Sequence, residues 1–295
     1  MPRKDGETLK LHRRAKGARI ARKTLAHIVL ILCSAVFIFP FLYMFFMSFM
    51  SDLESVGNPS VVFWPHSGWF ASNYIHVFDA DFIRYFFNTF IVIVVNLVLV
   101  PIASTFCAFG FTRCRFHGRE VCFSIVLSTI MLPAMAVQIP LYVIYVKLGW
   151  INTLLPLTVP AAFGGGAMNI FLAKQYMRTI PASLDEAAVI DGAGRFRIYW
   201  NIYMPLCSPI IIFIMIGVFN SNWNDFMSPL MYLRSPESYT LALGIYYKYS
   251  GRLTAMNFPN VQMATGVIMI IPSAVVFFIF QKQLIDGVAI GGVKG

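Results

Sequence analysis

Long uncharged apolar runs alternate with short charged segments along the chain. Six runs are long enough to cross the hydrocarbon core of a bilayer as tilted helices of about 20 residues. Their limits are 24–51, 85–112, 121–146, 148–173, 198–224 and 253–281. Transmembrane β-strands need only about ten alternating residues, so runs this long and continuous predict helices. The pattern therefore predicts an all-α membrane protein with six transmembrane helices.

Prolines and glycines interrupt the apolar runs. Each proline removes a backbone hydrogen bond and tends to kink its helix. The three glycines at 164–166 allow close helix approach or bending. The prolines within runs are Pro40, Pro101, Pro133, Pro140, Pro156, Pro160, Pro209 and Pro272. Membrane helices tolerate both residue types, but so many interruptions indicate a helical bundle that changes conformation rather than a rigid membrane anchor.

Composition agrees with a membrane location, and the basic residues indicate an orientation. The chain of 295 residues is 58% hydrophobic and 12% charged, whereas soluble chains are about a quarter charged. Nine of its 23 basic residues lie in 1–23, and most others flank the apolar runs. The net charge of +10 therefore predicts membrane topology and contact with lipid, with no nucleic-acid partner.

With the N-terminus inside, 18 Lys and Arg residues lie in inside segments and five in outside segments. The positive-inside rule then places both termini and the connector 181–205 in the cytoplasm. We divide the chain into a basic cytoplasmic tail at 1–23 and a transmembrane domain at 24–295. The tail is interpreted as an orientation signal, with contact to anionic lipid or a cytoplasmic partner as the alternative.

The connector 181–205 carries a helix-start signal. Ser183 followed by Glu186 fits a capping box, in which each side chain satisfies the other residue's free backbone N–H. Asp185 and Glu186 would lie in the first turn, where the helix dipole favours negative charge. Gly192 is placed to end the helix in a left-handed conformation. The sequence thus predicts a short, capped, charged helix between two spans.

Chemistry inside the apolar runs is restricted to neutral groups. They contain no ionisable residue at depth, which argues against a proton-coupled carrier. The chain also lacks the G-x-x-x-x-G-K-[ST] phosphate loop, catalytic constellations and metal-ligand spacings. We therefore expect no catalytic residue, metal site or cofactor in this chain.

A polar and aromatic cluster at the end of the fifth run is a candidate solute pathway. Asn amides hydrogen-bond hydroxyls, and the Trp223 ring can stack on the apolar side of a sugar. Asn220 and Asn224 are four residues apart and share a helix face. The alternative is that these amides bond neighbouring helices. Weaker candidates of the same kind are Asn96, Gln138, Asn169 and Gln262.

Several motifs resemble those of one transporter family. Glu186-Ala187-Ala188, Gly192, Ile202 and Met204-Pro205 follow the E-A-A-x3-G-x9-I-x-L-P loop of ABC importer permeases, with Met204 in place of Leu. The segments L-G-W-I-N-T at 148–153, A-A-V-I-D-G-A at 187–193, W-N-D-F at 223–226 and G-V-K-G at 292–295 resemble motifs of its sugar-type members. The match covers about 73 to the C-terminus and is similar to the second, maltose-permease-like, subunit.

The resemblance implies a type I ABC importer permease fold with a core at about 73–285 and a cytoplasmic coupling helix. It implies a sister permease, two copies of a cytoplasmic ABC ATPase that binds ATP-Mg, and an extracytoplasmic solute-binding protein. The aromatic outside loops 52–84 and 225–252 form the external face where that protein would dock. The location would be a bacterial or archaeal cell (inner) membrane. Residues expected to couple to the ATPase are Glu186, Ala187, Ala188, Asp191, Gly192 and Arg195.

The cargo implied is a sugar or a related polyol, and the absence of buried Arg or Lys favours a neutral one. The alternative function is a self-sufficient six-helix channel or secondary carrier. A membrane scaffold that passes no solute is a third class. Co-purification with an ATPase and a sister permease would distinguish the importer from both.

Overall fold

The computed structural model describes residues 4–57, 63–249 and 258–292, and within these ranges every regular element is a helix. Four stretches are long and apolar enough to cross a membrane: Arg22–Met47, Ala80–Arg113, Leu155–Met177 and Pro259–Gln283. Two further pairs, each bent at a break, pass the same test together: Arg119–Met131 with Met135–Lys147, and Arg195–Leu206 with Ser208–Trp223. If each bent pair is one span, the total is six. The predicted all-α membrane fold is confirmed.

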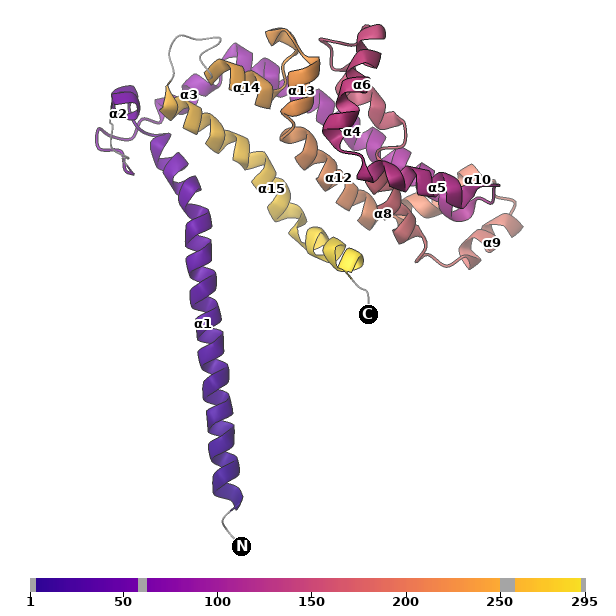
Figure 1. Cartoon of the computed structure of the whole chain (residues 1–295), viewed down its shortest axis with the longest axis horizontal. Coiled ribbons are helices and arrows are strands. Elements are labelled where there is room, and N and C mark those ends of the chain that lie inside the picture. The colour runs from indigo at the N-terminus through magenta and orange to yellow at the C-terminus, as the bar shows by residue number, and fades with distance from the viewer. Residues whose placement is uncertain (1–3, 58–62, 250–257, 293–295) are drawn as a thin grey trace. The chain divides into compact units, whose positions relative to one another are not determined.

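The chain forms two compact units, Met1–Val77 with Phe258–Met269, and Phe78–Asn257 with Ile270–Gly295. In the first unit, α1 (Lys4–Met47) is one long helix (Figure 1), so basic residues of the tail continue into the first span without a break. α2 (Asp52–Gly57), α3 (Ser72–Val77) and the start of α15 (Pro259–Gly292) complete this unit. Buried amides of Asn73 and Asn260 both donate to the carbonyl of Met50.

The second unit is built around α4 (Ala80–Arg113), which packs along α8 (Ala167–Met177) and α12 (Ser208–Trp223) (Figure 1). α4 begins at Ala80 because the Asp79 side chain accepts a hydrogen bond from the Phe82 N–H at 2.9 Å. A buried apolar cluster fills one end of this unit, and it comprises Val100, Ala108, Phe109, Ala173, Met177, Ile180, Ala188, Ile198, Tyr199, Tyr203, Cys207, Ile210, Ile214 and Val218.

The fourth predicted span differs from its expected limits of 148–173. Gly149 and Asn152 have φ of 70° and 66°, a left-handed conformation that a helix cannot contain. The helical part therefore starts with α7 (Leu155–Thr158) and η2 (Val159–Ala162) and, after a break at the three glycines, continues as α8 to Met177. It includes Lys174, which is 5% exposed, so the expected absence of buried Arg or Lys is wrong at this position. The predicted start at 148 and end at 173 are both wrong.

Glycine provides a close approach at the break between η2 and α8. Gly164, Gly165 and Gly166 have φ of 93°, 66° and 94°. A Cβ on Gly165 would lie 2.5 Å from the carbonyl oxygen of Val100 in α4. The predicted role of this glycine triplet in bending and close helix contact is therefore confirmed by geometry.

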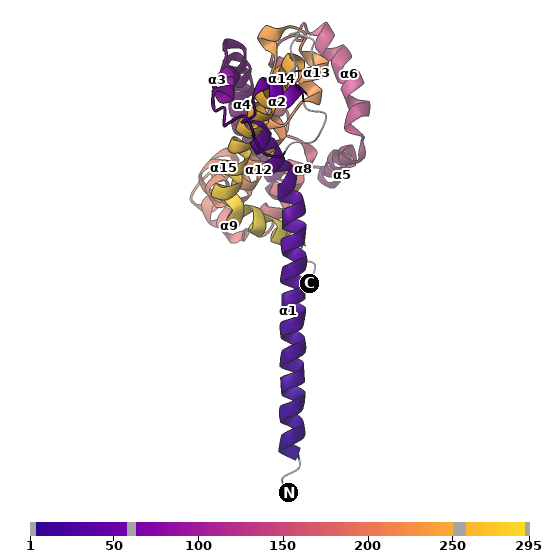
Figure 2. The ribbon, with the colours of Figure 1, turned by 90° about the vertical axis from the view of Figure 1, so that its left-hand side faces the viewer.

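Two other predicted spans are broken near their middles. α5 (Arg119–Ser128) and η1 (Thr129–Met131) are separated from α6 (Ala134–Lys147) by extended backbone at Leu132 and Pro133, and the bent pair is visible in Figure 2. The fifth run starts at the last residue of α10 (Arg195–Ile198) and continues through the π-helix η3 (Tyr199–Tyr203) and α11 (Met204–Leu206), and the chain bends by 76° before α12.

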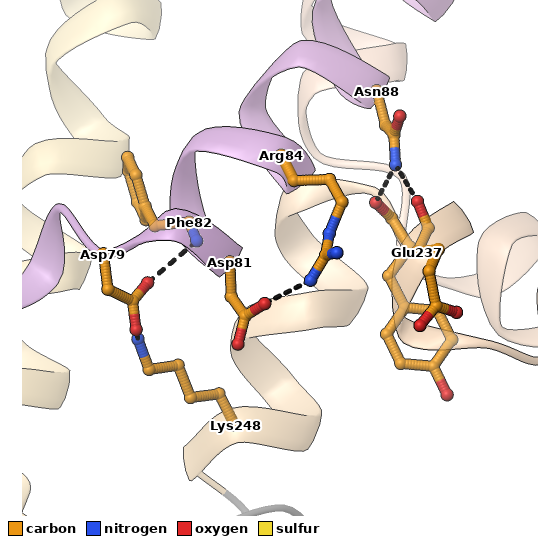
Figure 3. Close-up of polar contacts among 8 residues, drawn as sticks. Asp79, Asp81, Phe82, Arg84, Asn88, Glu237 and Lys248 are labelled. Atoms are coloured by element: carbon orange, nitrogen blue, oxygen red, sulfur yellow. Dashed lines mark hydrogen bonds and ion pairs between the residues drawn. The ribbon is translucent and has the colours of Figure 1, made fainter.

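The predicted outside loop 225–252 is folded through most of its length. α13 (Met227–Tyr232), η4 (Pro236–Ser238) and α14 (Leu241–Tyr249) follow α12. Figure 3 shows how this segment joins the start of α4: Lys248 pairs with Asp79, and the Asn88 amide donates to the carbonyls of Glu237 and Tyr239 at 2.9 Å.

Candidate functional site

The connector contains the predicted short helix, α9 (Ser183–Ile190), but it starts differently from the prediction. Asp185 and Glu186 lie in its first turn as expected. No side chain caps it, so the predicted capping box is wrong. The reason is that backbone carbonyls already satisfy the first N–H groups, because those of Asp185 and Glu186 both donate to the carbonyl of Ala182 at 2.9 and 3.2 Å. Ser183 is therefore the first helical residue, one position too late to be a cap.

The end of α9 matches the prediction. Gly192 has φ of 76°, its N–H donates to the carbonyl of Val189 at 3.0 Å, and the next N–H, of Ala193, donates to the carbonyl of Ala188 at 2.9 Å. These two bonds form a Schellman motif, which satisfies the last carbonyls of the helix. A Cβ on Gly192 would meet no atom within 4 Å, so backbone conformation alone favours glycine there.

One arginine fastens the connector to α4. Arg113, the last residue of α4, donates from Nη2 to the carbonyls of Met177, at 3.0 Å, and of Ile180. Its Nε lies 3.5 Å from Oδ2 of Asp185, and its guanidinium lies 5.2 Å from the ring centroid of Tyr203. The hydroxyl of Tyr203 donates to Oδ1 of Asp185 at 2.7 Å.

We name Arg113, Asp185 and Tyr203 the connector clamp. The side chains of its Arg and Asp are only 12% and 14% exposed, so their interaction is weakly screened by solvent. The sequence showed Arg113 only as an orientation charge, because its partners are remote in the chain. The acidic first turn of α9 was the one available signal for such a contact, since a largely buried carboxylate requires a cationic partner.

The expected coupling residues separate into an exposed set and one buried residue. Ala188 is 8% exposed and belongs to the apolar cluster of its own chain. Exposed side chains or backbone are found at Glu186, Ala187, Asp191, Gly192 and Arg195. Only this exposed set is available to a partner, and Ala188 instead anchors the helix.

The connector also exposes large apolar side chains, which we name the connector patch. Its members are Val189, Ile190, Phe196 and Trp200, with exposures of 52%, 85%, 67% and 48%. Phe196 and Trp200 stack with their ring centroids 6.4 Å apart. Exposing large apolar side chains to water is unfavourable, so such a patch on a polar connector indicates a contact surface.

The predicted pathway residues on α12 make mostly local contacts. Asn220 and Asn224 donate to the carbonyls four residues before them, at 3.1 and 2.9 Å. Trp223 is 5% exposed and its ring lies against Phe219 and Phe86. This geometry supports a packing role for Trp223, and its role in the pathway stays a prediction.

Of the weaker pathway candidates, Asn96 bonds other segments of the second unit and Asn169 bonds its own segment. Asn96 on α4 is 5% exposed and donates to Oδ1 of Asn222 at 2.7 Å and to the carbonyl of Leu157 at 2.9 Å. Asn169 donates to the carbonyl of Gly165, four residues before it, at 2.7 Å. The bonds of Asn96 match the alternative interpretation, in which amides join neighbouring helices, whereas that of Asn169 is local. Gln262 is exposed on α15.

Gln138 also has a buried side-chain oxygen, Oε1, without a hydrogen-bond partner among the described residues, as Asn96 has in Oδ1, but only Gln138 of these two lines a pocket. It lines a pocket of about 420 Å³ between the α5–α6 break, the α7–η2 segment and the start of α13. Asp225 and Ser228 line the same pocket. In the sequence Gln138 is only a weaker pathway candidate. Nothing there predicts that Asp225 lies near it, since the two residues are on segments remote in the chain.

The L-G-W-I-N-T segment has a structural role. The Oδ1 atom of Asn152 accepts from the N–H groups of Arg234 and Ser235, both at 2.9 Å, and from the hydroxyl of Ser238 at 2.7 Å. Its own N–H donates to the carbonyl of Tyr232 at 2.7 Å. One left-handed asparagine thus ties the turn after α6 to the segment between α13 and α14.

Comparison with known proteins agrees with this architecture. The sequence profile of the family described as "binding-protein-dependent transport system inner membrane component" matches residues 101–289. The maltodextrin transport system permease of Bacillus subtilis is 32% identical over 95% of this chain and 99% of its own length. The trehalose/maltose transport system permease of Thermococcus litoralis is 30% identical over 94% and 98%.

A solved structure is similar throughout. It is a chain of a bacterial ABC transporter involved in the import of the acidic polysaccharide alginate, with a TM-score of 0.78 and 26% identity over 90% of this chain and 97% of that one. The resemblance noted from the E-A-A loop is therefore confirmed. The chain belongs to the family of inner-membrane permease components of binding-protein-dependent ABC importers.

Proposed function

We propose that this chain forms half of the translocation pathway for a neutral sugar or related polyol, and that the connector 181–205 couples it to a separate ABC ATPase. A sister permease would supply the other half, and an extracytoplasmic solute-binding protein would deliver the solute. ATP-Mg would bind in two copies of the ATPase. Membership in a binding-protein-dependent family and the names of its sugar-transporting relatives support this proposal.

The observation that carries the coupling proposal is the connector patch on a clamped helix. Four large apolar side chains are exposed on a segment that the basic residues assign to the cytoplasm. A short amphipathic helix of this kind fits an apolar groove of a partner. The connector clamp joins α9 to the end of α4, so a force on the patch would be transmitted into a span.

The topology proposal follows from the same charges. Both termini and the connector would lie in the cytoplasm, and the segment 225–249 would lie outside. η4 and α14 pack on α4 there and α13 packs on α7, which would present a firm external surface to the binding protein. A self-sufficient channel or carrier gains no support from the family match.

Removing apolar area from the connector patch tests the proposal. We would purify the tagged chain from cells that express the whole transporter and measure the retained ATPase. Ile190→Ser and Phe196→Ser should lose the ATPase but keep the sister permease, because each removes exposed apolar area from the patch. Ile75→Ser is the control, since Ile75 is 75% exposed on α3, in the predicted outside segment. Undiminished ATPase in both patch variants would refute the coupling role.

A further inference from the structure

The pocket of about 420 Å³ in the second unit lies where several interrupted segments meet. We propose that it binds a neutral, hydroxyl-rich solute during translocation, with Gln138 and Asp225 as the acceptors that recognise hydroxyl groups. This proposal rests on the sugar transport proposed above and assigns a solute site to this subunit. Its volume falls within the range of about 300–1,000 Å³ that is typical of small-molecule sites.

The backbone at the pocket supports this assignment. Leu132 and Pro133 are extended, with ψ of 127° and 126°, in the middle of the apolar run 121–146. Non-helical backbone at membrane depth is tolerated only where it is covered by protein or lines a water-filled cavity. Met131 and Leu132 are 86% and 57% exposed in this chain. The break and the pocket it borders are therefore suited to line an aqueous route.

One acceptor in the pocket lacks a donor. Gln138 Oε1 is buried without a partner in the described chain, and a buried unsatisfied carbonyl is unfavourable unless a donor enters. Asp225 is held in place because its Oδ1 atom accepts from the N–H of Ser228 at 3.1 Å. A sugar carries many hydroxyl donors, so it satisfies amide and carboxylate acceptors together.

The charge of the pocket selects against acidic solutes. Asp225 is its one charged lining residue among those described, and no Lys or Arg lines it. A uronate carboxylate would meet the Asp225 carboxylate, which repels it. Two aromatic rings also line the pocket: Tyr145 and Tyr232 are 5% and 4% exposed, with ring centroids 5.2 Å apart. Such fixed rings suit the apolar faces of a sugar.

Protection of an introduced cysteine tests the site. Val137→Cys, at a lining position that leaves Gln138 and Asp225 in place, would be made in a chain whose exposed Cys33 and Cys122 are changed to Ser, and the complete transporter would be reconstituted in lipid nanodiscs. The rate at which maleimide labels the introduced cysteine would be measured in the presence of maltotriose, galactotriose, arabinotriose or sorbitol, and in the presence of the acidic trimannuronate. Labelling should slow by 1 + [L]/Kd, about threefold at twice the Kd, with at least one neutral solute.

Two further variants make the result decisive. Gln281→Cys on exposed α15 should label at the same rate with every solute, which excludes a general effect of sugar on the reaction. Asp225→Asn keeps an oxygen that can accept from the Ser228 N–H but removes the charge, so in the Val137→Cys background it should let trimannuronate protect. Absence of protection by all four neutral solutes, or equal protection by trimannuronate before that change, would overturn the proposal.

The outcome is independent of the coupling test. ATPase retained with the same purified preparation reports on the connector, whereas cysteine protection reports on the pocket. Cysteine protection without retained ATPase would contradict the coupling proposal and support the solute site in the pocket. Retained ATPase without cysteine protection would support the coupling proposal and contradict the solute site.

Discussion

Arg113 at the end of α4 and Asp185 in the first turn of α9 form an ion pair, with Nε and Oδ2 3.5 Å apart. The pair joins a membrane span to the connector helix. Because Arg113 also donates to the carbonyls of Met177 and Ile180, it holds three segments at one point. This arrangement gives the connector a fixed position relative to the span that it would move.

Removing the arginine of the connector clamp should loosen the connector. Arg113→Ala leaves the Asp185 carboxylate without its cation and two carbonyls without their donor, and we expect a loss of about 2–4 kcal/mol in stability. Asp185→Asn should cost less, because Asn can still accept from Tyr203. Thermal unfolding in detergent and solute-stimulated ATP hydrolysis would measure both. Arg115→Ala, at an exposed position in the same loop, is the control, and an equal loss in that variant would contradict the clamp.

The left-handed end of α9 predicts a graded effect at Gly192. No atom lies within 4 Å of a Cβ there, so only φ of 76° opposes a side chain. Gly192→Val should distort the C-terminal end of α9, at a cost of about 1–2 kcal/mol, whereas Gly192→Asn tolerates the conformation. We expect the Val variant to hydrolyse ATP without transport and the Asn variant to retain transport. Wild-type uptake by the Val variant would count against a role of α9 in coupling ATP hydrolysis to transport.

The close approach at Gly165 predicts a loss of stability on adding one methyl group. Its Cβ would lie 2.5 Å from the carbonyl oxygen of Val100, and its φ is 66°. Gly165→Ala should therefore cost about 2–4 kcal/mol through overpacking and backbone strain together. Gly110→Ala on α4 meets nothing within 4 Å and serves as control. Equal unfolding midpoints for both variants would show that the segments separate easily.

Trp223→Ala distinguishes packing from solute contact. Because Trp223 is 5% exposed against Phe86 and Phe219, its truncation should cost about 3–5 kcal/mol of stability and lower uptake in proportion to the folded protein. Trp223→Phe should recover part of both. Lost uptake in an alanine variant of unchanged unfolding midpoint would instead restore the pathway role.

Local patterns were readable without coordinates where the bilayer or one residue's backbone decides them. Apolar run lengths predicted the helices, and Gly192 predicted the end of α9. The predicted capping box failed because the turn begins at Pro181, where backbone carbonyls compete with the Ser183 hydroxyl. The start of the fourth span failed because Gly149 and Asn152 adopt left-handed backbone inside an uncharged run. Hydropathy does not register either effect.

By itself the sequence determined the membrane class and the family loop at 181–205, since these depend on run length and motif spacing, and its charge counts predict the cytoplasmic side of that loop. Only the tertiary structure decided that Arg113 meets Asp185, that Ala188 is buried while Ile190 is exposed, and that Gln138 and Asp225 share a pocket. The physical reason is that these relationships join residues remote in the chain. Their distances depend on how α4, α8 and α12 pack and where the spans break, and no local pattern encodes that geometry.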